Sequence, residues 1–121
     1  MNIDYQSILR KNMLNALKDI LKFTEVNGLR NGNHLYITFK IDKNFIAPNW
    51  LKKKFKDQMT IVIQYEYWNL KVGKNNFKIT LSFNDIKVNL KIPFDSIIAF
   101  EDPSKKFGLN LITKNNEIKS K

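Results

Sequence analysis

Side chains that do covalent or metal chemistry are scarce in this sequence. His34 is the only histidine and cysteine is absent, so a nucleophile with its base, or a thiolate or imidazole metal site, is hard to assemble. The four glycines form neither a phosphate-binding loop nor a dinucleotide fingerprint, and no Gly-x-Ser-x-Gly elbow occurs. We therefore expect no catalytic residue, no metal and no cofactor.

The other polar candidates fit solvated positions better than a site. His34 follows Asn33 at the start of an expected strand, and binding sites are few per protein, so we interpret it as a turn or surface histidine. The carboxylates show no metal-ligand spacing, and we interpret them as solvated: Asp42, Asp57, Glu66, Asp85, Glu101 and Asp102.

The apolar and aromatic run at residues 61–68 suits binding better than catalysis. If it forms one strand, Gln64 points away from the face that Ile63 and Tyr65 share, and that shared face serves the core. An amide offers two donors and an acceptor, which suits recognition of an extended peptide. An ordinary exposed glutamine is the alternative interpretation.

The net charge of +10, from 21 Lys and Arg against 11 Asp and Glu, favours an acidic partner. Charge alone does not separate nucleic acid, anionic lipid and acidic peptide, and a lysine-rich solvated surface explains it equally well. No apolar run approaches the roughly 18 residues of a membrane span, and no charged start leads into an apolar leader. With no cysteines to indicate an oxidising compartment, we expect a cytoplasmic protein that does not enter a membrane.

These side chains need elements to position them, and residues 5–26 are predicted to form one long helix. Asp4 is a suitable N-cap, and Gly28 is a suitable stop. Apolar residues recur between them at helical spacing: Ile8, Leu9, Met13, Leu17, Ile20 and Leu21.

The apolar arc of this helix, which runs from Ile8 round to Leu14, is wider than one core requires. We expect the helix to bury two faces, one on its own sheet and one on the same helix of a second copy in a two-fold dimer. Scattered exposed apolar residues are the alternative explanation. The residues expected at the dimer contact are Met13, Leu14, Leu17 and Leu21.

At 121 residues the chain fits one domain, and its pattern beyond Gly32 is mainly that of strands. A short helix is predicted at residues 48–55. We expect strands at residues 34–39, 60–68, 77–83, 86–92, 97–101 and 107–111. The predicted fold class is α+β and mainly β, a small curled sheet or open barrel with a long N-terminal helix.

The clearest local pattern is a hairpin with a two-residue turn at residues 84–85. Apolar and polar side chains alternate on both sides of that turn. Pairing outward from the turn places Phe83 opposite Ile86 and Lys78 opposite Lys91. One face of the hairpin is therefore expected to be apolar and the other cationic.

Five segments together resemble a known family. They are His-Leu-Tyr-Ile-Thr-Phe at residues 34–39, Met-Thr-Ile-Val-Ile-Gln at 59–64, Tyr-Trp-Asn-Leu at 67–70, Ile-Pro-Phe at 92–94 and Asp-Pro-Ser-Lys-Lys-Phe-Gly-Leu at 102–109. In order and spacing they resemble the alphaproteobacterial branch of the stringent starvation protein B (SspB) family, from the N-terminal helix to Leu111. The resemblance implies an Sm-like open barrel whose N-terminal helix makes a dimer.

The resemblance also implies a function without chemistry of its own. Members of the family bind the ssrA degradation tag, the peptide added to stalled translation products, and deliver the tagged protein to ClpX. The family glutamine implicated in tag recognition corresponds to Gln64. Expected walls of the groove are Ile63, Tyr65, Phe83, Asn84, Asp85 and Phe100. Lysines at 78, 87 and 91 could attract acidic residues of a tag or simply extend into water.

We divide the chain into a substrate-binding domain, residues 1–111, and a short tail, residues 112–121. The resemblance implies a long acidic linker whose end docks on ClpX, whereas ten residues follow Leu111. Either a short tether suffices, or the sequence lacks its tail, or delivery is lost. The residues expected to dock on ClpX are Ile118, Lys119 and Lys121.

Two other functions stay open. A basic Sm-like nucleic-acid-binding module would explain the charge, and a structural protein that only dimerises would explain the helix. We favour a proteolytic adaptor that is not an enzyme. Its expected partners are ssrA-tagged polypeptides, the ClpX ATPase of ClpXP and a second copy of the chain, with nucleic acid disfavoured.

Overall fold

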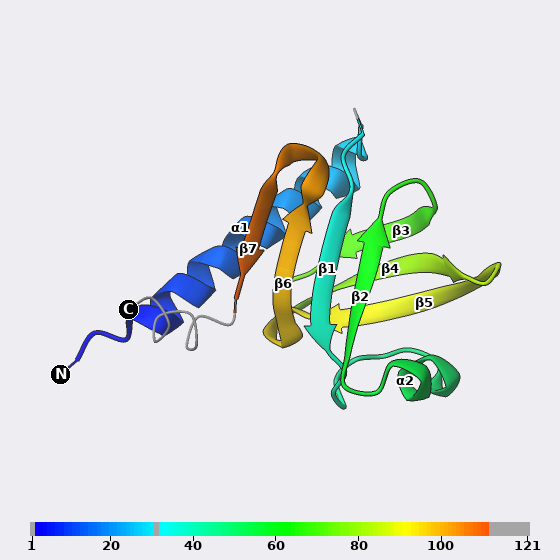
Figure 1. Ribbon diagram of the computed structural model, residues 1–121, viewed down its shortest axis with the longest axis horizontal. Helices are drawn as coiled ribbons and strands as arrows, with labels where there is room; N and C mark the ends of the chain where they lie inside the picture. The colour runs from blue at the N-terminus through cyan, green and yellow to red at the C-terminus, as the bar shows by residue number, and fades with distance from the viewer. Residues whose placement is uncertain (1, 31, 112–121) are drawn as a thin grey trace.

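The computed structural model describes residues 2–30 and 32–111 (Figure 1). In chain order its elements are α1 (Tyr5–Asn27), β1 (Leu35–Lys40), α2 (Asn49–Phe55), β2 (Gln58–Ile63), β3 (Tyr67–Val72), β4 (Asn76–Phe83), β5 (Ile86–Pro93), the 3₁₀ turn η1 (Phe94–Ser96), β6 (Ile97–Asp102), the 3₁₀ turn η2 (Pro103–Lys105) and β7 (Phe107–Asn110).

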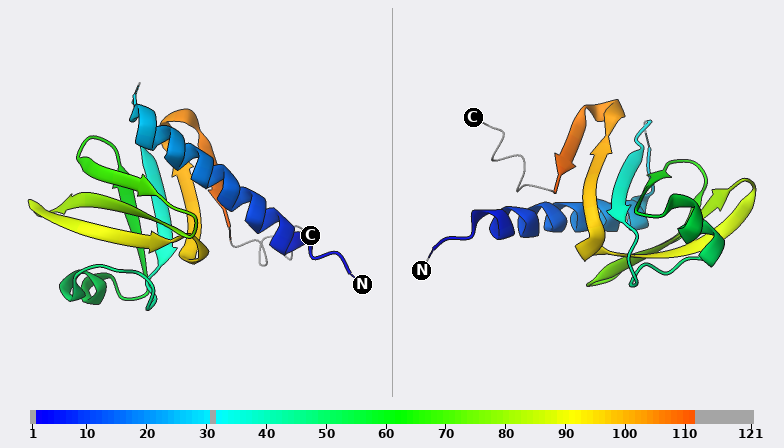
Figure 2. Two further views of the ribbon diagram at one scale, coloured as in Figure 1. Left: turned by 180° about the vertical axis from the view of Figure 1, so that it is seen from behind. Right: turned by 60° about the horizontal axis from the view of Figure 1, so that its bottom comes forward.

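The strands form two antiparallel sheets, and over the described residues these do not close into a barrel. One sheet has the order β2-β1-β6-β7, and the other has the order β3-β4-β5. In Figure 1 the strands of the second sheet run across those of the first, and α1 lies behind β6 and β7, as the reverse view in Figure 2 shows. The predicted α+β, mainly β fold class is confirmed.

The long helix forms as the sequence predicts and ends one residue later. Asp4 caps it, because its carboxylate accepts hydrogen bonds from the backbone N–H of Ser7 at 3.1 Å and from the Ser7 hydroxyl at 2.7 Å. Gly28 follows the last turn with a φ of 75°, a conformation that favours glycine. Its N–H donates to the carbonyl of Thr24 at 2.8 Å and closes the helix.

Arg10 fixes the first half of α1 to the end of the four-stranded sheet. Its guanidinium donates to the carbonyls of Ile97 at 3.1 Å, Leu111 at 3.4 Å and Asp95 at 2.8 Å. The planar fork of donors suits several fixed acceptors at once. Near the other end of α1, a carboxylate oxygen of Glu25 accepts from the backbone N–H of Val72 at 2.9 Å, so the helix contacts both sheets.

The core fills the space between the two sheets and is closed by the two helices. Its fully buried side chains come from all of these layers: Leu17 and Leu21 of α1, Ile37 and Phe39 of β1, Leu51 of α2, Ile61 and Ile63 of β2, Phe77 and Ile79 of β4, Ile92 of β5 and Phe100 of β6. Neither helix in the described part of the chain is long and apolar enough to cross a membrane.

Candidate functional site

The chain crosses from one sheet to the other in a bend at residues 64–66. β2 ends at Ile63 and β3 begins at Tyr67, so the single strand predicted at residues 60–68 is wrong. The apolar pattern conceals the break because β2 and β3 both turn apolar side chains toward the same core.

Gln64 therefore lies in a bend between two sheets and not on the face of a strand. Its side chain is half-buried, and the neighbouring Tyr65 is 85% exposed. In an unbroken strand Tyr65 would share the buried face of Ile63, and the bend turns it out to solvent instead. An amide and a phenol ring are thus presented side by side at the surface.

The predicted hairpin is confirmed in position, turn and register. Residues 84–85 have φ values of 51° and 67°, the left-handed pair that a two-residue type I′ turn requires. Phe83 pairs with Ile86 and Lys78 pairs with Lys91, as expected.

The bend lies beside this hairpin turn. Tyr67 at the start of β3 pairs with Leu81 near the end of β4. The bend directly precedes Tyr67, and the hairpin turn begins three residues after Leu81, so the two are neighbours in space. In Figure 1 the β2–β3 connection and the end of the β4–β5 hairpin lie on the same side of the molecule, as they do in Figure 2. We name this region, residues 64–66 together with residues 83–86, the bend–hairpin end.

Apolar and polar surface alternate at the bend–hairpin end. Ile86 is 55% exposed and Phe83 is half-buried, while Asn84 and Asp85 are exposed at the turn. Ile86 was not among the expected groove residues, although its pairing with Phe83 could have indicated it. The region offers apolar contact, amide hydrogen bonds and two exposed carboxylates, Glu66 and Asp85, which suits an extended peptide better than a small charged ligand.

Two of the expected groove residues are placed wrongly. Ile63 is 0% exposed and Phe100 is 1% exposed, so neither side chain can touch a ligand unless the core opens. Phe100 lies in the four-stranded sheet with its ring 5.9 Å from that of Phe107, and it supports the fold there. The alternation at residues 61–68 places Ile63 on the core side, and its position next to Gln64 in the sequence does not make it a wall of the groove.

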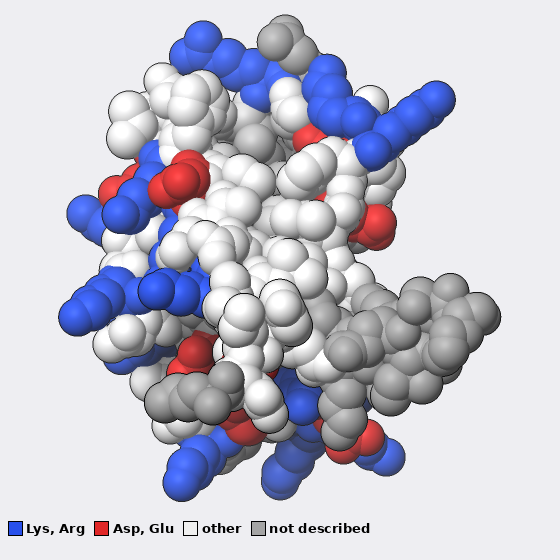
Figure 3. Space-filling view, turned by 90° about the vertical axis from the view of Figure 1, so that its left-hand side faces the viewer, with Lys and Arg blue, Asp and Glu red and all other residues white. Residues whose placement is uncertain are grey.

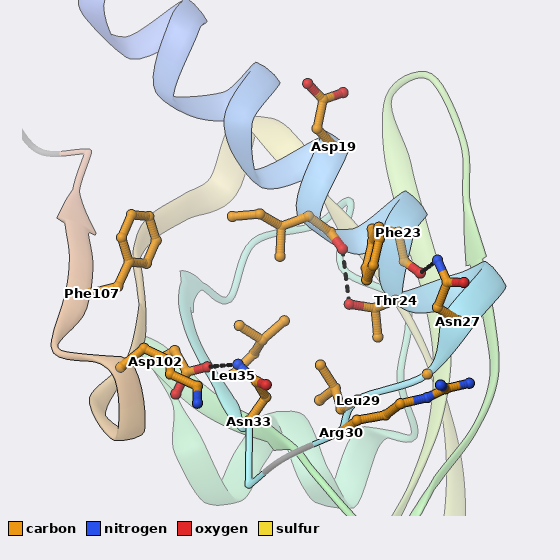
Figure 4. Close-up of a pocket in the computed structure, with 13 residues that line it drawn as sticks. Asp19, Phe23, Thr24, Asn27, Leu29, Arg30, Asn33, Leu35, Asp102 and Phe107 are labelled. Carbon is orange, nitrogen blue, oxygen red and sulfur yellow. Dashed lines mark hydrogen bonds between the residues drawn. The ribbon is translucent and has the colours of Figure 1, made fainter.

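A larger groove, of about 720 Å³, runs between α1 and the β6–β7 turn (Figure 4). We name it the α1 groove. Its apolar lining comes from Ile20, Phe23, Leu29, Leu35 and Phe107. Phe23 is 67% exposed and Phe107 is 41% exposed, so two large apolar side chains of the groove stay in contact with solvent. Nothing in the sequence marks this groove, because β7 and α1 meet only in the folded chain.

The predicted dimer contact on α1 also needs correction. Leu14, Leu17 and Leu21 are 9%, 0% and 0% exposed, because they pack into the core of their own chain and have almost no surface for a partner. Met13 is half-buried and keeps some surface. The excess apolar arc exists, but it lies about 100° round the helix from the buried leucines, as a stripe beside them.

That second apolar stripe follows spacings of four, three, four and three residues: Leu9, Met13, Ala16, Ile20 and Phe23. This is the spacing of a coiled-coil seam, which keeps apolar residues on one line along a helix. Leu9 is 48% exposed and Phe23 is 67% exposed. We name these five residues the α1 seam, and its last two members also line the α1 groove.

A buried carboxylate fixes the far wall of the α1 groove. Asp102 is 4% exposed and accepts hydrogen bonds from the amide of Asn33 at 2.7 Å and from the backbone N–H of Ser104 at 3.1 Å. Burial alone would raise the pKa of Asp102, but hydrogen bonds from Ser104, Asn33 and the backbone of His34 outweigh it and hold the pKa below its ordinary value.

Replacing Asp102 with asparagine is expected to flatten the acid limb of the stability curve. A carboxyl whose pKa is lower in the folded than in the unfolded chain stabilises the fold above the ordinary pKa of about 3.9, and this contribution is lost as the pH falls below it. Urea midpoints at pH 6 and pH 3 measure the difference, with Asp57→Asn as the control at an exposed carboxylate. Equal falls in midpoint for Asp102→Asn and the wild type would contradict this assignment.

The described residues show no arrangement for metal or nucleophilic chemistry. No group of three or more His, Cys, Asp or Glu side chains there could hold a metal ion. His34 is half-buried, with its Nδ1 3.0 Å from the carbonyl oxygen of Gly32 and its ring 5.4 Å from that of Tyr36. It is thus held in a turn, as the sequence interpretation has it.

Comparison with known proteins adds one finding. The family model described as SspB: Stringent starvation protein B matches residues 7–121 of the chain, which is essentially its whole length. No curated protein matches the sequence. The residues expected to dock on a partner, Ile118, Lys119 and Lys121, lie outside the described residues.

Proposed function

Because the chain belongs to the stringent starvation protein B family, we propose that it binds ssrA-type degradation tags and delivers tagged proteins to the ClpXP protease. This is an adaptor family and not an enzyme family, and membership supports a ClpXP adaptor role in general. The observation that carries the proposal is the family match over residues 7–121. Three finer statements are also part of this proposal: that the chain binds the ssrA tag, that it forms a dimer, and that it is located in the cytoplasm.

The tag is proposed to bind at the bend–hairpin end. Gln64 is half-buried, which limits its rotamers, and its amide can pair with both a donor and an acceptor of an extended peptide. The exposed ring of Tyr65, the exposed aliphatic side chain of Ile86 and the half-buried ring of Phe83 provide apolar surface. Alternate side chains of an extended peptide could contact this surface. Ile63 and Phe100 support this region from within the core instead of touching the tag.

Replacing Gln64 with alanine is expected to weaken binding of an ssrA peptide about tenfold. Losing the amide leaves polar groups of the bound peptide unpaired, at about 1–3 kcal/mol, and 1.4 kcal/mol corresponds to tenfold in affinity. Fluorescence anisotropy of a labelled peptide measures the change. Gln58→Ala, at the opposite end of β2, is the matched control and is expected to bind as the wild type does. Unchanged affinity for Gln64→Ala would remove this residue from the site.

We further propose a dimer formed by the α1 seam. Its exposed apolar residues and the α1 groove make one continuous apolar region, and specific interfaces bury such a region from water. Figure 3 looks onto the side where α1 and β7 lie and shows uncharged surface down its centre with Lys and Arg mostly at the margins. Fewer charges at the centre than at the rim is typical of a protein interface.

The C-terminal segment completes the proposal. Ile118, Lys119 and Lys121 combine an apolar side chain with cations, and we propose that they dock on ClpX. The five segments of the sequence that resemble the alphaproteobacterial branch support placing the chain there.

A further inference from the structure

Three lysines stand in register across the three-stranded sheet. Lys71 of β3 pairs with Lys78 of β4, which pairs with Lys91 of β5. Adjacent strands are about 4.8 Å apart, so the three side chains leave the sheet as one row. Like charges directly opposite each other are destabilising. We name these residues the lysine row.

A β-bulge brings Lys71 into the row. Trp68 pairs with Thr80 and Lys71 pairs with Lys78, so β3 uses one residue more than β4 over this interval. Asn69 is one of the two β3 residues that lie opposite a single β4 residue in this interval. It has a φ of 56°, a left-handed conformation that asparagine tolerates better than most residues. Without the bulge, Trp68 and Lys71 would point to opposite faces. The bulge in β3 is therefore the irregularity that places Lys71 on the same face as Lys78 and Lys91.

The lysine row borders a shallow hollow of about 420 Å³ on the outer face of the sheet. A chain of hydrogen bonds forms its floor: the Asn69 amide donates to the Thr80 hydroxyl at 3.3 Å, which donates to the Asn89 amide oxygen at 2.6 Å. Ile46 stands at one rim and is 56% exposed. No carboxylate is among the residues that line the hollow in the described part of the chain. The hollow is therefore cationic and has no neutralising partner of its own.

We propose that the lysine row binds acidic residues of the captured polypeptide, in the segment that precedes the part held at the bend–hairpin end. This inference rests on the proposed function and extends it to the substrate's flanking sequence. Phe83 faces the core side of the sheet and Lys78 faces the outer side, so the peptide reaches the lysine row by passing over the exposed turn at Asn84. Asn84 lies six positions from Lys78, which corresponds to about 20 Å of strand, and an extended peptide covers that distance with about six residues, since each spans about 3.3–3.6 Å.

An acidic peptide fits this face better than a single-stranded nucleic acid. Binding of single strands depends on aromatic rings whose faces are free to stack on bases. Trp68 shares the outer face of the sheet with the row, because it pairs with Thr80 two residues from Lys78, and the ammonium of Lys87 already lies 4.2 Å from the centre of its ring. Carboxylates need only the cations and the amide groups of the hollow.

The test compares two ssrA peptides by fluorescence anisotropy at low salt. Both carry the same six-residue extension before the tag, with glutamates at the fourth to sixth positions from the tag in one and glutamines in the other. The acidic peptide is expected to bind the wild type about fivefold more tightly, and the gain is expected to shrink at high salt. The double variant Lys78→Gln/Lys91→Gln is expected to lose this gain and keep its affinity for the neutral peptide. Lys53→Gln, an exposed lysine of α2, is the control and keeps the gain.

The outcomes separate the two proposals. Equal binding of both peptides by the wild type, or a gain that survives in the double variant, overturns the lysine row while tag capture stands. Failure of the neutral peptide to bind overturns tag capture, and the lysine row with it. Tighter binding of a single-stranded RNA than of the acidic peptide at physiological salt, lost in the double variant, assigns the row to nucleic acid and overturns the proposal.

Discussion

Replacing Phe23 with glutamate is expected to convert the protein from a dimer to a monomer while leaving its fold intact. Phe23 ends the α1 seam and is 67% exposed in the single chain, so the change removes little from the core. In a two-fold dimer the same residue occurs twice, and two glutamates would be buried without partners. A buried unpaired charge costs several kcal/mol, enough to separate a dimer at micromolar concentration.

Light scattering measures this change directly. The wild type is expected at twice the single-chain mass of 14.3 kDa, and Phe23→Glu at that single mass. Asn15→Glu places the same charge on an exposed position of α1 outside the seam and is expected to stay dimeric. A second variant, Leu9→Glu, tests the other end of the seam and is also expected to be monomeric. A wild type that already has a mass of 14.3 kDa at micromolar concentration would contradict the dimer.

This prediction depends on a distinction that the sequence does not make. The helical pattern showed that α1 has more apolar surface than one core needs, and that conclusion agrees with the exposed seam. It did not show which stripe faces the core, because Leu17 and Ile20 are equally apolar. Only the position of the sheets relative to the helix decides which of them is fully buried. The core holds Leu14, Leu17 and Leu21, Ile20 is half-buried beside them, and Phe23 stays exposed.

Local signals of the sequence were the most informative ones. Asp4 as N-cap, Gly28 as stop and the turn at residues 84–85 each act over a few residues, and all three are confirmed. The strand predicted at residues 60–68 failed because its apolar alternation continues across a bend between two sheets. Nothing in the local pattern marks a change of sheet when both sheets cover one core.

Long-range contacts could not be read from the sequence. Arg10 donates to carbonyls 85 to 101 residues away, and a carbonyl is present at every residue, so the sequence does not single out these acceptors. The bulge at Asn69 is likewise invisible without the partner strand, although an asparagine inside a strand is a weak indication of left-handed backbone. The pattern at residues 61–68 did not distinguish Gln64 from an ordinary exposed glutamine, the family resemblance favoured it as a binding residue, and the structure shows that it lies in a bend.

Addition of the protein is expected to accelerate degradation of a tagged substrate by ClpXP several-fold when the substrate is dilute. An adaptor that holds both the tag and the protease raises the effective concentration of one near the other, and the gain disappears when the substrate is saturating. Gln64→Ala is expected to lose most of the acceleration through weaker tag binding, whereas Gln58→Ala is expected to keep it. Removing residues 115–121 is expected to abolish acceleration while tag binding is unchanged.

The initial rate of degradation of an ssrA-tagged fluorescent reporter by purified ClpXP, with and without the protein at a reporter concentration well below saturation, tests the adaptor role most directly. The proposed function predicts a several-fold higher rate with the wild type, a rate near the baseline with Gln64→Ala, and no effect of either on an untagged reporter. An unchanged rate with the wild type, under conditions where ClpXP degrades the reporter unaided, would contradict it.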